Sequence, residues 1–161
     1  MRAGVDLVTP FTFWVSAGDQ YDLVQPTAFA ASVAARLCAA IVKPSAGRIL
    51  IGDFETRLQA PQAKRRIGFV DARGFEGDAH AFACEVAFHA DVWGVAPSLA
   101  HERARHALAT LARDDAYARA LALALVADVS IVVLDLPGPG VVADTRALVP
   151  DVAIVATSVA R

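Results

Sequence analysis

Residues 129–134, VSIVVL, form a run dominated by apolar, β-branched side chains, and this run decides the fold class. β-branched residues favour strands, and a strand without polar alternation is typical of one covered on both faces. Residues 151–157, DVAIVAT, repeat the pattern near the end of the chain. Because such strands occur in parallel sheets with helices on both faces, we predict an α/β fold.

Strand-like and helix-like segments alternate on either side of this run. Residues 28–42 predict an amphipathic helix, because apolar side chains recur every four residues along one face. These side chains are Phe29, Val33, Leu37 and Ile41. Further strands are predicted at residues 11–15, 21–25, 48–53 and 65–71.

The middle of the chain predicts several helices in succession. The first runs from Ala79 to Trp93 and is closed by Gly94. Ser98 is the predicted N-cap of the next helix, and Asp114 or Asp115 caps a third, since their side-chain oxygens can accept from free N–H groups. A short helix is predicted at residues 142–148. We interpret residues 1–161 as a single domain, with a helical subdomain at about residues 74–127 inserted into the α/β core.

Composition and charge narrow the classes of function. The chain has 161 residues, 56% of them hydrophobic and 20% charged, which indicates a globular protein. The net charge is −2 and the densest basic stretch is Lys64 to Arg66, so nucleic acid is not an expected partner. Cys38 and Cys84 lie in helical patterns, and we expect two buried free thiols.

The sequence favours a cytoplasmic protein that does not insert into a membrane directly. No uncharged stretch is long enough to span a bilayer. The N-terminal residues resemble a signal peptide superficially, but Asp6 and Pro10 interrupt the apolar run.

Five segments in fixed order resemble the ATP-binding domain of ABC-type ATPases. They are KPSAGRILIGD at 43–53, RRIGFVD at 65–71, EVAFHADVWG at 85–94, ALALALVADVSIVVLDLP at 120–137 and DVAIVATS at 151–158. The resemblance implies a P-loop NTPase-like, ABC ATPase-like sheet flanked by helices, with a shortened helical subdomain.

The family's phosphate-binding loop would fall on residues 25–32, QPTAFAAS. Its glycines let backbone N–H groups turn toward phosphate oxygens, and its lysine meets the terminal phosphates. The glycine positions hold Gln25, Ala28 and Ala30, and the lysine position holds Ala31. Only Ser32, at the position of the magnesium-binding hydroxyl, matches. The resemblance therefore implies a degenerate Walker A motif.

The other nucleotide motifs are also altered. The Walker B aspartate is kept as Asp135, but Leu136 occupies the position of the general-base glutamate and can neither accept a proton nor orient water. Ala72 stands at the glutamine position and Ser158 at the switch histidine. The signature falls on residues 111–115, LARDD, whose carboxylates would repel a phosphate. We therefore expect a pseudo-ATPase without a nucleotide cofactor.

Two small constellations could be taken for metal sites. Ser32 and Asp135 could be a leftover magnesium site, and the alternative that we favour is a hydrogen-bonded pair filling the collapsed loop. His80, Glu85 and His89 could be called a metal cluster, but Glu85 and His89 are four residues apart on one helix face, which indicates a solvated pair rather than a metal site.

The segment from Gly74 to Val95 is unusually aromatic. It contains Phe75, Phe82, Phe88 and Trp93. These side chains either form the core of the subdomain or present a docking surface, which in the family receives a membrane permease.

Three functional hypotheses follow from the resemblance. The first is a non-catalytic protein-interaction or regulatory subunit, whose partner is a membrane permease, an intact ABC ATPase subunit or a second copy. The second is a weak ATP-binding transporter subunit completed in trans by an active partner. The third is a small-molecule binding module that has reused the emptied loop. Under the first hypothesis the protein reaches a membrane only through its partner.

Overall fold

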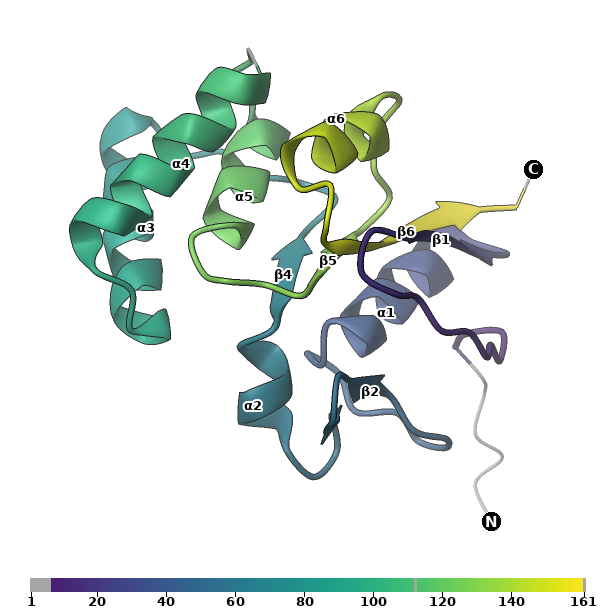
Figure 1. Cartoon of the computed structure of the whole chain (residues 1–161). Helices are drawn as coiled ribbons and strands as arrows, with labels where there is room; N and C mark the ends of the chain where they lie inside the picture. Colours follow the sequence, from purple (N-terminus) through teal and green to yellow (C-terminus); the bar gives the residue numbers. More distant parts are fainter. Residues whose placement is uncertain (1–6, 112, 161) are drawn as a thin grey trace.

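The centre of the molecule is a four-stranded parallel sheet (Figure 1). The computed structural model describes residues 7–111 and 113–160. The strands are β1 (Gln20–Gln25), β4 (Ile67–Val70), β5 (Ile131–Leu134) and β6 (Ala153–Val159), and they lie in the order β1-β6-β5-β4. Each neighbouring pair is parallel, which confirms the predicted α/β fold.

Helices cover both faces of the sheet (Figure 1). α1 (Ala28–Cys38) packs on one face, while α5 (Ala116–Ala124) and α6 (Val141–Leu148) pack on the other. Because successive side chains of a strand point to opposite faces, β5 contributes to both interfaces. Ile131 and Val133 join the cluster under α1, and Val132 and Leu134 join the cluster under α5 and α6. The strand at residues 131–134, within the apolar run, is thus buried from both sides.

Three helices form a second layer beside the sheet (Figure 1). α3 (Ala79–Trp93), α4 (Pro97–Leu111) and α5 share a buried cluster that contains Val86, Val126 and several alanines. α5 also packs on β4, so it joins this helical layer to the sheet. The assignment of a subdomain to about residues 74–127 of a single domain remains our interpretation.

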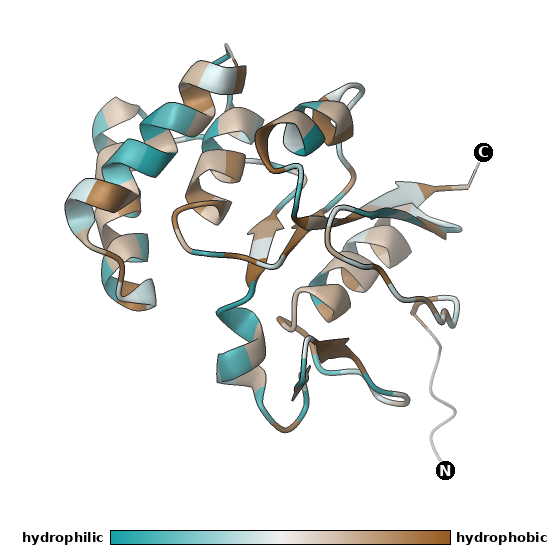
Figure 2. Ribbon diagram, in the orientation of Figure 1, coloured by the Kyte–Doolittle hydropathy of each residue, from teal (hydrophilic) through white to brown (hydrophobic). Residues whose placement is uncertain are grey.

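A short hairpin and one helix lie below the sheet in Figure 1. β2 (Leu50–Ile51) pairs with β3 (Phe54–Glu55), and α2 (Ala60–Lys64) follows. Gly52 has a φ of +57°, a left-handed conformation that glycine adopts without strain, and it turns the chain between the two strands. The strand predicted at 48–53 is therefore two residues long and ends in this turn. β2 is strongly hydrophobic in Figure 2, and its Leu50 is exposed.

The helix predicted at residues 28–42 forms, but it is shorter and buries a different face. α1 ends at Cys38, and Ala40 has a left-handed φ of +56°. The buried side chains are Ala30, Ala31, Ala34, Ala35 and Cys38. Phe29 and Ile41 are instead exposed. The expected apolar face was wrong because small side chains let the helix lie close to the sheet, where a row of large side chains would hold it away.

Two other local predictions were wrong. Residues 11–15 lie outside both sheets, although Phe11, Phe13 and Val15 pack against the core under α1. Their alternating burial resembles that of a strand, but burial of side chains does not require backbone pairing. Ser98 is the second residue of α4 rather than its cap, because the helix already begins at Pro97, whose fixed φ suits the first helical position.

Other local predictions are confirmed or corrected by the structure. α3 spans Ala79–Trp93 and ends at Gly94, which has a φ of +66°. Asp115 caps α5 by accepting from two backbone N–H groups of its first turn. Cys38 is buried as expected, but Cys84 is exposed on α3. Asp6 and Ala112 lie outside the described residues.

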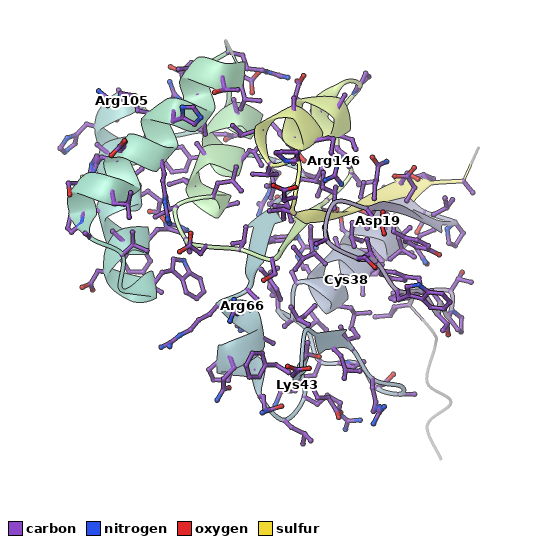
Figure 3. All side chains as sticks on the ribbon, in the orientation of Figure 1. Asp19, Cys38, Lys43, Arg66, Arg105 and Arg146 are labelled. Atoms are coloured by element: carbon purple, nitrogen blue, oxygen red, sulfur yellow. The ribbon has the colours of Figure 1, made fainter. Side chains whose placement is uncertain are left out.

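Arg146 of α6 connects the helix to the amino ends of two strands (Figure 3). Its guanidinium donates to the carbonyls of Val152 and Asp19 at 2.7 and 2.6 Å. These bonds hold the segments that lead into β6 and β1. Across residues 7–111 and 113–160, no helix combines the length and the hydropathy needed to cross a membrane.

Candidate functional site

The carboxyl ends of the parallel strands are where open α/β sheets bind ligands, so the site is built from there. β1 ends at Gln25, and Pro26 and Thr27 lead directly into α1. Thr27 is the N-cap, and its side-chain oxygen accepts from the N–H of Ala30 at 3.1 Å. The turn between strand and helix is therefore short, and one N–H group in the first turn of α1 already has a hydrogen-bond partner within the chain.

The side chain of Gln25 is turned toward the N-terminal segment. It is buried, and its amide oxygen accepts from the N–H of Thr9 at 2.9 Å while its amide nitrogen donates to the Thr9 carbonyl at 3.4 Å. The residue at the first glycine position of the resemblance thus holds the segment before β1 against the end of that strand.

Ser32 and Asp135 are in contact although they are 103 positions apart in the sequence. The Ser32 hydroxyl donates to Oδ1 of Asp135 at 2.8 Å, and Asp135 lies at the end of β5 with its side chain fully buried. The hydrogen bond that we expected between these residues is therefore present. The other oxygen of Asp135, Oδ2, has no hydrogen-bond partner among the described residues.

A guanidinium completes this arrangement. Arg36 is one turn after Ser32 on α1, and its Nη2 lies 3.0 Å from Oδ2 of Asp71 and 4.0 Å from Oδ2 of Asp135. Asp71 directly follows β4, and its Oδ1 also accepts from the backbone N–H of Arg73 at 3.0 Å. We call Ser32, Arg36, Asp71 and Asp135 the carboxyl-end cluster. It joins α1 to the ends of two strands.

The two carboxylates of the carboxyl-end cluster have opposite pKa shifts. Burial raises the pKa of Asp135, and the Ser32 hydroxyl and the charge of Arg36 offset this only in part. Burial also acts to raise the pKa of Asp71, but the backbone and guanidinium of Arg73, together with Arg36, outweigh it and the pKa is lowered. Asp135 is the more deeply buried of the two, which accounts for the difference.

These shifts predict two opposite pH dependences of stability. The folded state holds the proton of Asp135 more tightly, so Asp135 adds to the free energy of unfolding below its unfolded pKa near 3.8. This stabilisation is lost as the pH rises through the raised pKa. Asp71 adds to the free energy of unfolding above its unfolded pKa, and that stabilisation is lost as the pH falls through the lowered pKa. We expect D135N to remove the first dependence and D71N the second. Urea midpoints from pH 3 to 7 measure both, and a D135N profile parallel to that of the native protein would contradict the assignment.

The residues around this turn do not match the donor set that a nucleoside triphosphate with Mg²⁺ requires. Residues 25–33 contain no lysine, arginine or glycine, and Ala28, Ala30 and Ala31 present methyl groups. Asp135 is the carboxylate that would lie nearest a bound Mg²⁺. Its Oδ2 is 4.0 Å from the guanidinium of Arg36, and that positive charge would repel a divalent cation.

Leu136, Ala72 and Ser158 are the residues that the sequence resemblance assigns to the hydrolysis motifs. Leu136 has a left-handed φ of +48°, and its N–H donates to the Thr157 hydroxyl at 3.1 Å. This bond holds an uncommon backbone conformation for a side chain of its size. Ser158 and Ala72 are exposed. No group of three or more potential metal ligands occurs within the described residues.

The four aromatic residues of the 74–95 segment have different surroundings. Phe75 and Phe82 contact each other edge to face, with ring centroids 5.8 Å apart, and pack on the helical cluster. Phe88 is 59% exposed, and Trp93 is half-buried. Trp93 and Phe75 line a groove of about 350 Å³ between the helical layer and the sheet. Whether the four residues dock a partner stays a prediction.

The groove has an apolar floor and a basic rim. Its floor includes Phe69 of β4 and Leu123 of α5, and Lys64 and Arg65 lie at its edge. Asp71 of the carboxyl-end cluster also lines it. An occupant of the groove would therefore lie next to the ion pairs that join α1 to the loop after β4.

Arg36, Asp71 and the Gln25–Thr9 contact were not identified from the sequence. Asp71 follows a strand just as Asp135 does, and carboxyl ends of parallel strands meet at one edge of a sheet. Arg36 is four residues after Ser32, on the same helix face. These two spacings would have identified the cluster, whereas the contact of Gln25 with Thr9 has no such signal.

Comparison with solved structures identifies the fold. An ATP-binding subunit of an ABC transporter matches with a TM-score of 0.63 at 12% identity, over 94% of this chain and 72% of the other. CbiO1 from Clostridium perfringens, part of the ABC transporter complex CbiONQ, matches with a TM-score of 0.65 at 19% identity, over 94% and 71%. An ATP-binding cassette dimer bound to ADP and Pi gives 0.67 at 14% identity, over 94% and 79%.

The chain thus has the fold of ABC transporter ATP-binding domains, a P-loop NTPase-like sheet flanked by helices. No protein-family model and no curated protein sequence matches it.

Proposed function

We propose that this protein is a non-catalytic member of a transport or regulatory assembly that binds another protein through its ABC-like domain. The observation that carries the proposal is the carboxyl-end cluster. Asp135 accepts a hydrogen bond from Ser32 and lies near Arg36, at the position where the nucleotide's metal ion would need a free carboxylate. The guanidinium of Arg36 takes the place of Mg²⁺ beside Asp135, so the fold persists without a nucleotide.

The groove beside Trp93 is the proposed docking site. Its apolar floor suits the apolar face of an amphipathic helix, and Lys64 and Arg65 at the rim favour acidic residues on that helix. The expected partner is a membrane permease or an intact ABC ATPase subunit, or a second copy of this chain. The protein would act in the cytoplasm and reach a membrane through that partner.

A second candidate function rests on the two residues that are kept. Ser32 and Asp135 occupy the positions of the magnesium-binding hydroxyl and the Walker B carboxylate, which favours a weak ATP-binding subunit completed in trans by an active partner. This candidate requires measurable affinity for ATP with Mg²⁺.

Thermal denaturation with and without millimolar ATP and Mg²⁺ distinguishes the two candidates. A ligand at a hundred times its Kd adds about 2.7 kcal/mol to the free energy of unfolding, which shifts the melting temperature by several degrees. We expect no shift, and no ATP hydrolysis above the buffer rate. A shift that requires Mg²⁺ and is lost in D135N would favour the second candidate and contradict the proposal.

Affinity capture from native lysate tests the docking site. Trp93→Ala is expected to reduce capture of a specific partner at least tenfold, because an aromatic side chain in an interface groove carries much of the binding energy. Phe88→Ala separates this groove from the wider surface of four aromatic residues predicted from the sequence, since Phe88 is exposed on the same helix but does not line the groove. Capture should be the same with and without ATP. Equal loss in both variants, or capture only with ATP, would contradict the proposal.

A further inference from the structure

A second, larger cavity lies at the opposite end of the sheet from the carboxyl-end cluster. Its volume is about 590 Å³. Ile131 and Ala153, the first residues of β5 and β6, lie in its wall, and so does Cys38, the last residue of α1 (Figure 3). Small-molecule sites typically fall between about 300 and 1,000 Å³, so the size suits a small organic ligand.

Two segments from different parts of the chain line this cavity. The N-terminal segment contributes Phe11, Phe13 and Trp14, and β2 with the residue before it contributes Ile49 and Leu50. Phe13 is held in place by stacking on Tyr21, with ring centroids 4.1 Å apart and planes at 6°. The N-terminal segment therefore contributes aromatic side chains to the lining, and the β2 segment contributes aliphatic ones.

Trp14 is the most exposed large apolar side chain on the described surface, at 87%. Leu50, which also lines the cavity, is 53% exposed. Large exposed apolar side chains gain stabilisation when a ligand covers them. Their exposure indicates that an apolar group beside them would be favoured over water.

The cavity carries one charged lining residue, Arg48. Cys38 does not add a negative charge, because burial raises the pKa of its thiol to about 12. The other polar side chains in the lining, Thr12 and Ser130, are neutral hydrogen-bonding groups. Arg48 is exposed, and no ion pair involving it occurs among the described residues. Its guanidinium is thus available to a carboxylate or sulfonate.

We propose that this cavity binds a small amphipathic anion, with an aromatic body against the apolar lining from the N-terminal segment and β2 and an acidic head group on Arg48. The proposal does not rest on the proposed function, because the cavity shares no residue with the carboxyl-end cluster or with the groove beside Trp93. The aromatic wall selects the body of the ligand, and the single positive charge selects the sign of its head group.

Tryptophan fluorescence gives a direct test with a known probe. The chain has two tryptophans, so Trp93→Phe leaves Trp14 as the sole reporter. Titration of this variant with anilinonaphthalene sulfonate, an aromatic anion, is expected to quench Trp14 emission in a saturable manner. Arg48→Gln in the same background should weaken the apparent Kd about three- to tenfold, the range for losing one charge-assisted contact at a solvated site.

Two controls make the test specific. Arg57→Gln removes an exposed arginine that does not line the cavity and should leave the Kd unchanged. The neutral analogue N-phenylnaphthylamine should bind the Arg48→Gln variant as tightly as it binds the parent with Arg48. Urea midpoints of the Arg48→Gln and Arg57→Gln variants should agree with that of the Trp93→Phe parent, because both arginine side chains are exposed.

Two results would overturn the inference. One is equal affinity for the anionic probe with Arg48 and with Arg48→Gln. The other is a probe that leaves Trp14 emission unchanged but quenches Trp93 in a Trp14→Phe variant, which would place the probe in the groove of the helical layer.

Discussion

Gly74→Ala is expected to lower the free energy of unfolding by about 3 kcal/mol or more. Gly74 has a φ of +72°, where a side chain is strained, and an added Cβ would lie 2.6 Å from the backbone carbon and oxygen of Ala116. Backbone atoms at the start of α5 cannot move aside without moving the helix. The neighbouring Phe75 N–H donates to the Ala116 carbonyl at 2.7 Å, and the same shift would break this bond.

Gly94→Ala is the matched control for this prediction. Gly94 has a similar φ of +66°, but an added Cβ would meet nothing within 4 Å. The loss there should be about 1 kcal/mol, the cost of the left-handed conformation alone. Urea denaturation measures both variants, and equal losses would show that the close approach to Ala116 is not a constraint. Because Gly74 and Phe75 line the groove beside Trp93, G74A should also reduce partner capture.

Arg36→Met is expected to have the second largest effect, a loss of about 2 kcal/mol at neutral pH. Removing one partner of a buried ion pair costs about 3–5 kcal/mol, and the solvent exposure of Arg36, 33% of its side chain, reduces that figure. The variant leaves Asp135 fully buried with Ser32 as its side-chain partner. The loss should diminish at acidic pH, where Asp135 is protonated.

Arg73→Met provides the comparison within the same group of charges. Its side chain is 82% exposed, and its ion pair with Asp71 should contribute less than about 0.5 kcal/mol. A double-mutant cycle of R36M with D135N isolates the pair: the loss caused by R36M should shrink in the D135N background. If R36M costs the same in both backgrounds, Arg36 does not act on the charge of Asp135.

The main elements of the fold could be predicted from local patterns. The apolar run at 129–134 predicts a strand buried on both faces, and β5 is such a strand. Gly94 predicts the end of α3, and Asp114 or Asp115 predicts the start of α5, because both signals act on backbone groups within a few residues. The structure shows that Asp115 is the cap. Residues 11–15 have the alternation of a strand but no strand beside them, and pairing is not a local property.

The candidate site could be predicted only in part. Ser32 and Asp135 were identified through the resemblance, which depends on position in the chain and not on distance in space. Arg36 and Asp71 complete the carboxyl-end cluster only because α1 packs with its alanine face on the sheet and thereby brings Arg36 to the end of β4. The apolar row predicted at Phe29, Val33, Leu37 and Ile41 lies on another face, so the sequence alone favoured another orientation of the helix.

The sequence by itself determined the strands of the parallel sheet, the main helices, the end of α3 at Gly94, and the absence of any cation or glycine from residues 25–33. These properties follow from propensity, periodicity and side-chain chemistry, which act over a few residues. Only the tertiary structure decided that Arg36 faces Asp135, that Gln25 holds Thr9, and that Trp14 and Arg48 lie around one cavity. Each of these contacts joins residues far apart in the chain, and such contacts form only when helices and strands pack in one particular arrangement.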